Sequence, residues 1–302
     1  MNQPIRFTLP LRSRLMFLFL TLVIGMIITG TISYFIMRSG MTTPKVRIAT
    51  VMQDLFLFIL PAIATAVIIT RRPAELLAIA PVRIVPLTWI AAIGALIASI
   101  PAMNTLVEWN ASLSLPDSLA SVEQWMRTSE ESAQAMIEVL TGPHSVISLI
   151  MSILIVGIFA GFSEEILFRG ALQRILVTGH INVHAAVWFT AFIFSAIHLQ
   201  FFGFFPRLLL GAFFGYLLVW TRSLWVPVTL HALNNTIVVI SMWRSQAAAT
   251  ATQPIADSNS ASSVSTLDLN TLGAGSPLWV SLSIILTALF LYLVIRSSRS
   301  TQ

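Results

Sequence analysis

The sequence predicts an all-α fold, a polytopic transmembrane bundle of about eight helices. The 302 residues are 56% hydrophobic and 10% charged, with a mean hydropathy of +0.86, which excludes an ordinary soluble globule. Several apolar runs reach about 20 residues, the length that crosses a bilayer as a helix. No series of short alternating strands is visible, so the sequence does not predict a transmembrane barrel.

The apolar runs predict eight membrane-crossing helices. They cover residues 15–37, 50–70, 85–107, 145–168, 183–202, 206–221, 225–243 and 277–296. The first run follows three arginines, as the apolar part of a signal peptide would. It is too long for that role and lacks a small-residue cleavage site, so we expect a retained helix.

Polar segments divide the chain into four parts. Residues 1–144 hold the N-terminal helices and an outer loop, 145–243 a helical core, 244–276 a polar loop, and 277–302 the last helix and the tail. The outer loop, 108–143, is acidic and contains two tryptophans, so we expect a helix near the membrane interface. Residues 247–275 are rich in Ala, Ser and Thr and cannot bury enough apolar surface to become ordered, so we expect disorder there.

The basic residues predict an orientation rather than a nucleic-acid partner. The net charge is +5, but Lys and Arg of membrane proteins gather on cytoplasmic flanks. Ten basic residues flank the predicted helices on the side of the N-terminus and six on the other side. We therefore expect both termini in the cytoplasm and no nucleic-acid partner. The chain has no cysteine, which removes thiol nucleophiles and thiolate metal sites.

The most informative motif is Glu164-Glu165-Ile166-Leu167-Phe168-Arg169-Gly170, which follows an almost wholly apolar stretch. Charges at membrane depth are costly and indicate function. Glu165 and Arg169 are four residues apart on one helix face, so they can neutralise each other. Glu164 points about 100° away and has no local partner.

Two further polar clusters could complete a site with Glu164. They are Phe194-x-x-x-His198 and His231-x-x-x-Asn235. Glu164 and His198 lie equally far from a turn near Ile181, so an antiparallel hairpin places them at the same height. This requires the fourth helix to continue through Gln173 and Ile175. On the same reasoning, His231 and Asn235 lie several ångströms closer to the inner side.

The three clusters suit hydrolysis. A desolvated Glu164 can act as general base on a water that His198 orients, while His231 and Asn235 offer donors to an oxyanion. Alternatively, Glu164, His198 and His231 could hold a zinc ion that activates the water. A recognisable zinc spacing is absent, so we favour metal-free catalysis.

The three clusters, in this order and each on a hydrophobic helix, resemble the CPBP family of intramembrane proteases. This is the group of CAAX prenyl proteases and Abi (bacteriocin-processing) proteins. The likeness covers about residues 145–240 and includes Gly211-Ala212-Phe213-Phe214-Gly215-Tyr216 and Ser223-Leu224-Trp225-x-Pro227.

The resemblance implies a membrane endopeptidase, with residues 145–243 as its catalytic core. Glu164, assisted by His198, would activate water; His231 and Asn235 would stabilise the oxyanion; Glu165 and Arg169 would support the site. The expected partners are a protein or peptide substrate and membrane lipid. The expected location is a bacterial inner membrane. With zinc, the same protein would be a metalloprotease.

Other interpretations of the polar residues remain open. Asn234 could replace Asn235 as oxyanion donor, whereas we expect His144, His180 and His184 to be non-catalytic interfacial residues. The chain could be a non-catalytic immunity or scaffold protein, although retained intramembrane charges argue against this. A transporter or proton channel is disfavoured because the polar clusters lie only in the second half of the chain.

Overall fold

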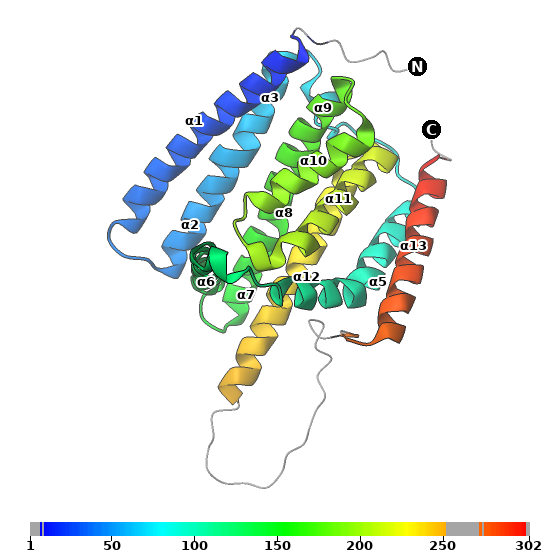
Figure 1. Ribbon diagram of the computed structural model, residues 1–302. Helices are drawn as coiled ribbons and strands as arrows, with labels where there is room; N and C mark the ends of the chain where they lie inside the picture. Colours follow the sequence, from blue (N-terminus) through cyan, green and yellow to red (C-terminus); the bar gives the residue numbers. More distant parts are fainter. Residues whose placement is uncertain (1–6, 8, 252–271, 274, 300–302) are drawn as a thin grey trace, which may run out of the picture.

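The computed structural model describes residues 7, 9–251, 272, 273 and 275–299. Every element in this part of the chain is helical, apart from an isolated bridge between Phe7 and Thr70. The helices form a bundle in which most run roughly along one direction (Figure 1). The predicted all-α class is therefore confirmed.

The first half of the chain forms a hairpin and a bent helix. Its elements are α1 (Leu11–Met37), α2 (Thr43–Gln53), α3 (Leu60–Ile69), the short α4 (Pro73–Leu76) and α5 (Pro86–Ala111). A π-helical turn, Asp54–Ile59, joins α2 and α3 into one continuous helix. Helix α5 bends by 40° near Pro101, which lacks the backbone donor of a regular turn.

The second half holds the long central helices. Its elements are the 3₁₀ turns Asp117–Leu119 and Phe201–Gly203, and the helices α6 (Ala120–Thr141), α7 (Val146–Ser152), α8 (Ala160–Glu165), α9 (Arg174–Thr178), α10 (Val183–Ala196), α11 (Phe204–Thr221), α12 (Trp225–Ala251) and α13 (Pro277–Arg299). π-Helical turns at Ile153–Phe159 and Ile166–Gln173 join α7, α8 and α9 into one helix, Val146–Thr178. The fourth predicted helix therefore does continue through Gln173 and Ile175.

Each of the eight predicted spans coincides with a helix of the described residues, and two of them differ from expectation, α5 by its bend and α10 by its length. Six helices are long and apolar enough to cross a membrane, and α5 makes a seventh if its two bent parts form one span. Helix α10 has 14 residues, about 21 Å, and ends before the predicted boundary at 202. The helix ends at Ala196, Ile197 and His198 form a turn, and Leu199 then takes a left-handed φ of +52°.

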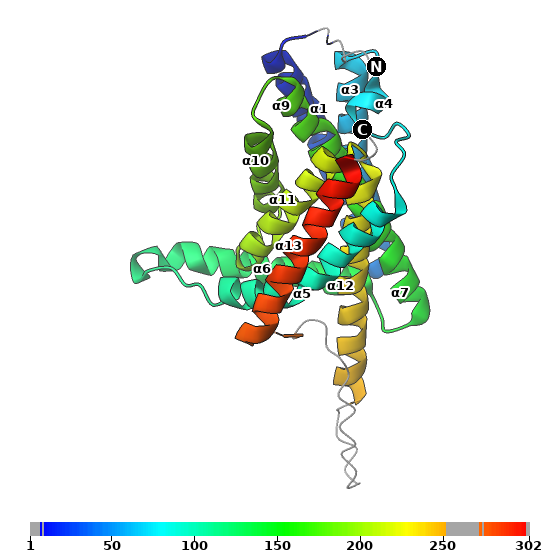
Figure 2. The ribbon, with the colours of Figure 1, turned by 90° about the vertical axis from the view of Figure 1, so that its right-hand side faces the viewer.

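The arrangement of the helix ends fits an even number of crossings. The start of α1 and the end of α13 lie at the same end of the bundle (Figure 1). At the other end α6 lies across the direction of the spanning helices (Figure 2), in the acidic segment for which we expected an interfacial helix. There the Leu115 N–H and Arg127 hold the pKa of Glu123 below its ordinary value.

The polar segment predicted to be disordered is only partly described. Helix α12 runs to Ala251 and so extends into residues 244–276. Residues 252–271 and 274 lie outside the described residues, and the expectation of disorder there stays a prediction.

Two apolar cores flank the middle of the Val146–Thr178 helix. One joins that helix to α1, α3 and α4, with Ile69, Leu76 and Ile166 almost fully buried. The other joins α5, α11, α12 and α13, with Phe214 and Leu230 almost fully buried. The two glutamates of the motif directly precede Ile166 of the first core, and His231 directly follows Leu230 of the second.

Candidate active site

Small residues allow the Val146–Thr178 helix to approach α12 closely. A Cβ on Gly161 would lie 3.1 Å from the backbone nitrogen of Ala232, and one on Gly157 only 2.7 Å from the Thr236 hydroxyl oxygen. Small residues at helix interfaces permit this approach inside a membrane. The contact brings Glu164 and Glu165, one turn after Gly161, against His231, which precedes Ala232.

Glu165 is the centre of a buried polar network. It is 0% exposed, and its Oε1 accepts hydrogen bonds from Arg169 Nη1 at 2.7 Å and from His231 Nδ1 at 2.8 Å. The predicted Glu165–Arg169 pair is therefore present, and His231 joins it from α12. Charge-assisted hydrogen bonds of this length are the strong ones, so the network fixes the two helices relative to each other.

Arg169 extends the network to a third helix. Its Nη2 donates to the Gly211 carbonyl of α11 at 2.9 Å. Its guanidinium also lies over the Phe194 ring of α10, with 4.5 Å between the guanidinium carbon and the ring centroid. One fully buried side chain thus contacts α8, α10 and α11, which suits the supporting role that we expected for it.

Glu164 lies on the other side of the same imidazole. Its Oε2 is 3.6 Å from His231 Nε2, and its side chain is 16% exposed. The two carboxylates therefore bracket His231, and Glu164 is the more accessible of the two. The sequence showed no partner for Glu164 within its own helix; α12 supplies one.

His198 lies in the turn that follows α10 and has a defined tautomer. Its Nδ1 lies 2.8 Å from the Phe194 carbonyl oxygen, which can only accept, so Nδ1 carries the proton. In the neutral ring Nε2 is then free to accept a hydrogen bond. The Phe194 ring makes edge contacts with both His198 and His231, and Glu164 lies within electrostatic range of His198.

Asn235 lies one turn beyond His231 on α12. Its Nδ2 donates to the Val156 carbonyl at 3.1 Å, from the π-helical turn Ile153–Phe159, and its Oδ1 lies 3.4 Å from Asn234 Nδ2. An amide nitrogen carries two protons, so one donor of Asn235 is not used by Val156. The structure thus places Asn235 beside the histidine, with one N–H available.

Asp54 is a polar residue of this region that the sequence interpretation missed. It is 2% exposed, and its carboxyl group lies within interaction range of Ser163 and Glu164. Among the described residues, its Oδ2 has no hydrogen-bond partner. The signal was present, because Asp54 is an acidic residue inside a predicted span, and such residues indicate function.

The other histidines lie away from this network. His184 Nδ1 is 2.8 Å from the Tyr216 hydroxyl, and His144 stacks on Trp243 with 4.2 Å between ring centroids. His180 lies in the turn after α9 with a left-handed backbone. The interfacial, non-catalytic roles expected for these histidines stay a prediction.

The described part of the chain contains no group of three His, Cys, Asp or Glu side chains arranged to hold a metal ion. In particular, the alternative zinc ligands Glu164, His198 and His231 do not form such a group. His231 Nδ1 is already bonded to Glu165, and Nε2 faces Glu164. Catalysis without a metal ion stays a prediction.

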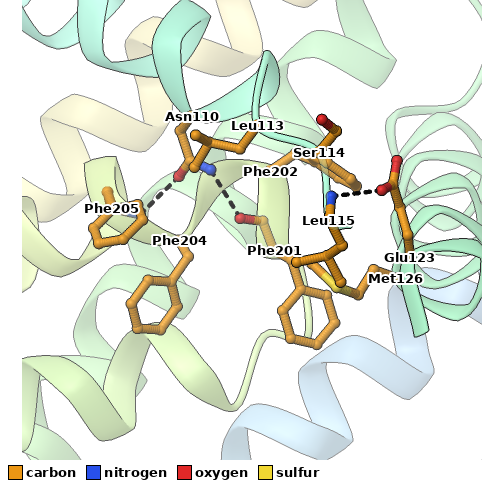
Figure 3. A pocket seen from close by; sticks show the side chains of 10 residues that line it. All are labelled: Asn110, Leu113, Ser114, Leu115, Glu123, Met126, Phe201, Phe202, Phe204 and Phe205. Atoms are coloured by element: carbon orange, nitrogen blue, oxygen red, sulfur yellow. Dashed lines mark hydrogen bonds between the residues drawn. The ribbon is translucent and has the colours of Figure 1, made fainter. Parts of the chain in front are cut away.

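A cavity of about 200 Å³ lies beside the site rather than in it. Two leucines from the segment after α5 and four phenylalanines from residues 201–205 form most of its wall, and α6 adds Glu123 and Met126 (Figure 3). None of the predicted site residues lines it. Phe201 and Phe202, shortly after His198 in the chain, belong to the wall of this cavity.

Fold and site together define an integral membrane protein with a buried carboxylate–histidine centre. Residues 146–237, from the start of α7 into α12, match the family model of Rce1-like type II CAAX prenyl endopeptidases. The predicted resemblance is confirmed over that segment, which contains every predicted site residue. The matched proteins are endopeptidases, so the predicted enzyme class, a hydrolase of peptide bonds, is confirmed. No curated protein and no solved structure matches the chain.

Proposed function

We propose that this protein is an intramembrane endopeptidase in which Glu164 activates water without a metal ion. The observation that carries the proposal is the arrangement of two carboxylates around one imidazole inside the matched segment. Glu165 is 0% exposed, and its Oε1 is bonded to both Arg169 and His231, whereas Glu164 is partly exposed and makes only a longer contact. Glu164 is therefore the carboxylate left free for a substrate water.

In the attack step, Glu164, His198 and Asn235 act on the water and on the scissile carbonyl. The Glu164 carboxylate takes a proton from water as the water oxygen forms a bond to the carbonyl carbon of the scissile peptide. His198 Nε2 accepts the second water hydrogen and so orients the nucleophile. The carbonyl electron pair moves to oxygen, where the free N–H of Asn235 donates to the oxyanion. A proton on His231 Nε2 would add a second donor.

The collapse step returns the proton. The oxyanion re-forms the carbonyl, the C–N bond breaks, and Glu164 transfers its proton to the leaving amine nitrogen. The products are an amine and a carboxylic acid, which then loses its proton to solvent water, and the Glu164 carboxylate is regenerated. Glu165 and Arg169 take no part in the bond changes; they hold His231 in place, with Nδ1 donating and Nε2 directed at Glu164.

We further propose the substrate and the location. The description of the matched family supports a membrane-associated peptide with a prenylated C-terminal CAAX sequence as the first substrate to test. The excess of basic residues on one side supports cytoplasmic termini, in a bacterial inner membrane.

The proposal is tested with purified protein in lipid nanodiscs and an internally quenched peptide that ends in farnesyl-Cys-aliphatic-aliphatic-X. Wild type is expected to cleave the peptide and Glu164→Gln is not. A parallel comparison of the membrane peptidome of cells with wild type and with Glu164→Gln identifies other substrates. Absence of any Glu164-dependent cleavage in both experiments would contradict the proposed activity.

A further inference from the structure

Arg207 is a cation near the candidate site that the proposed mechanism does not use. It lies in the first turn of α11, four residues before Gly211, whose carbonyl accepts from Arg169. Its guanidinium donates to the backbone oxygen of Gln200 at 3.4 Å and to Gln200 Oε1 at 2.8 Å. Arginine has five donors, and within the described residues no acidic side chain forms an ion pair with this one.

The charges around Arg207 place it between the site and α6. Glu164 of the site and Glu130 of α6 both lie within electrostatic range of the guanidinium. His198 lies within the same range. Arg207 is half-buried, yet Glu130 is too distant to pair with it directly. A half-buried guanidinium that forms no ion pair with a described acidic side chain is suited to a substrate anion.

The segment that carries Arg207 is held rigidly. Asn110, at the end of α5, donates from Nδ2 to the Phe201 carbonyl at 3.0 Å and accepts from the Phe205 N–H at 2.9 Å (Figure 3). These two bonds clamp both ends of residues 201–205, between Gln200 and Arg207. Asn110 is 2% exposed, so the clamp is protected from water. The guanidinium is therefore preorganised, which lowers the entropic cost of binding a ligand.

The charge balance favours a singly charged ligand. Glu130 and Glu164 both repel an anion placed at Arg207, and a phosphate would feel about twice the repulsion of a carboxylate. A carboxylate also matches the guanidinium fork through two parallel hydrogen bonds. A peptide substrate carries this group at its C-terminus and on Asp or Glu side chains.

We propose that Arg207 is the carboxylate-binding subsite of this protease and holds a carboxylate of the peptide substrate beside the scissile bond. This inference rests on the proposed peptidase function and adds to it a residue that determines substrate selection. The carboxylate comes either from the chain terminus or from an acidic side chain, and the experiment separates these sources.

The experiment uses three forms of the farnesylated peptide. One ends in a free acid, one in an amide, and one in an amide with Asp as the residue X; an Asn version of the third form is its control. We expect wild type to prefer at least one carboxylate form over its uncharged control by at least about tenfold in kcat/KM, the size of a charge-assisted hydrogen bond. Selectivity for the free acid identifies the chain terminus, and selectivity for Asp identifies a side chain.

Variants connect the selectivity to Arg207. Arg207→Gln should cleave charged and uncharged forms equally, and Arg207→Lys should keep part of the preference because it retains charge but not the fork. Arg127→Gln is the matched control, since Arg127 is exposed and paired with Glu123. It should keep the full selectivity. Thermal unfolding of each variant verifies that the fold is retained.

Binding measurements separate failure of the subsite from failure of the proposed activity. Fluorescence anisotropy with Glu164→Gln protein measures binding of the acid and amide forms without cleavage. Wild type could cleave no peptide while the protein still binds the acid form more tightly than the amide form, and only with Arg207 present. In that case the subsite stands and the proposed activity fails.

Two results would overturn the subsite. One is equal cleavage and equal binding of charged and uncharged forms by wild type. The other is that the activity of Arg207→Gln differs from that of wild type only when phosphatidylglycerol replaces phosphatidylcholine in the nanodisc. This result would assign the anion to lipid phosphate.

Discussion

Replacement of Glu165 by glutamine tests the buried network. The amide keeps the shape of the side chain but removes the charge that Arg169 and His231 share at 2.7 and 2.8 Å. Arg169 is fully buried, and its remaining hydrogen bond runs to the Gly211 carbonyl. Loss of one partner of such a pair leaves an uncompensated buried charge, which costs about 3–5 kcal/mol.

A loss of this size is a large fraction of the stability of most proteins, about 5–15 kcal/mol. We therefore expect Glu165→Gln to unfold at much lower denaturant and to accumulate poorly in the membrane. The assay is unfolding in mixed micelles, followed by the fluorescence of the eight tryptophans. Glu123→Gln, which breaks the exposed pair with Arg127, is the control and should unfold like wild type.

A double variant refines the test of the pair. Glu165→Leu with Arg169→Met removes both charges and should be more stable than Glu165→Gln alone, because no unpaired charge remains. A Glu165→Gln protein as stable as wild type yet inactive would refute this reasoning and exchange the roles of the two carboxylates.

Four further predictions concern the site and the helix packing around it. Asn235→Ala should lower turnover by about 10²–10³-fold as a lost oxyanion donor, and a loss below about threefold would remove it from the mechanism. Exhaustive chelation should leave the activity unchanged; activity lost to a chelator and restored by zinc would make the protein a metalloprotease. Gly161→Val should separate the Ala160–Glu165 helix from α12 and abolish activity, whereas Gly30→Val, with open space around Gly30, should not; equal activity of both would contradict the close approach. Asp54→Asn should not lower the stability, because Asp54 faces Glu164 without a cationic partner among the described residues; a clear loss would reveal a bond that its carboxylate makes.

The sequence predicted the helices well because membrane spans need long apolar runs. It missed the end of α10, because residues after His198 stay apolar while the chain turns at Leu199. Hydropathy cannot distinguish apolar residues that continue a helix from apolar residues that line a cavity, as Phe201 and Phe202 do.

The site residues were identified by type and spacing, but their contacts were only partly predicted. The Glu165–Arg169 pair follows from helix periodicity, whereas the bond from His231 to Glu165 does not. Heights estimated along separate helices placed His231 closer to the inner side of the membrane than the carboxylates. The close contact of Gly161 with Ala232 instead brings His231 next to Glu164 and Glu165. Asp54 was overlooked because it comes from a helix outside the three clusters.

The central claim is that Glu164 is the base that activates water. The most direct measurement is the turnover of purified wild type and Glu164→Gln on the same peptide, with equal unfolding profiles as a condition. The mechanism predicts a fall of about 10²–10⁴-fold, the usual contribution of a general base, with little change in stability. Cleavage by a correctly folded Glu164→Gln at the wild-type rate would contradict it.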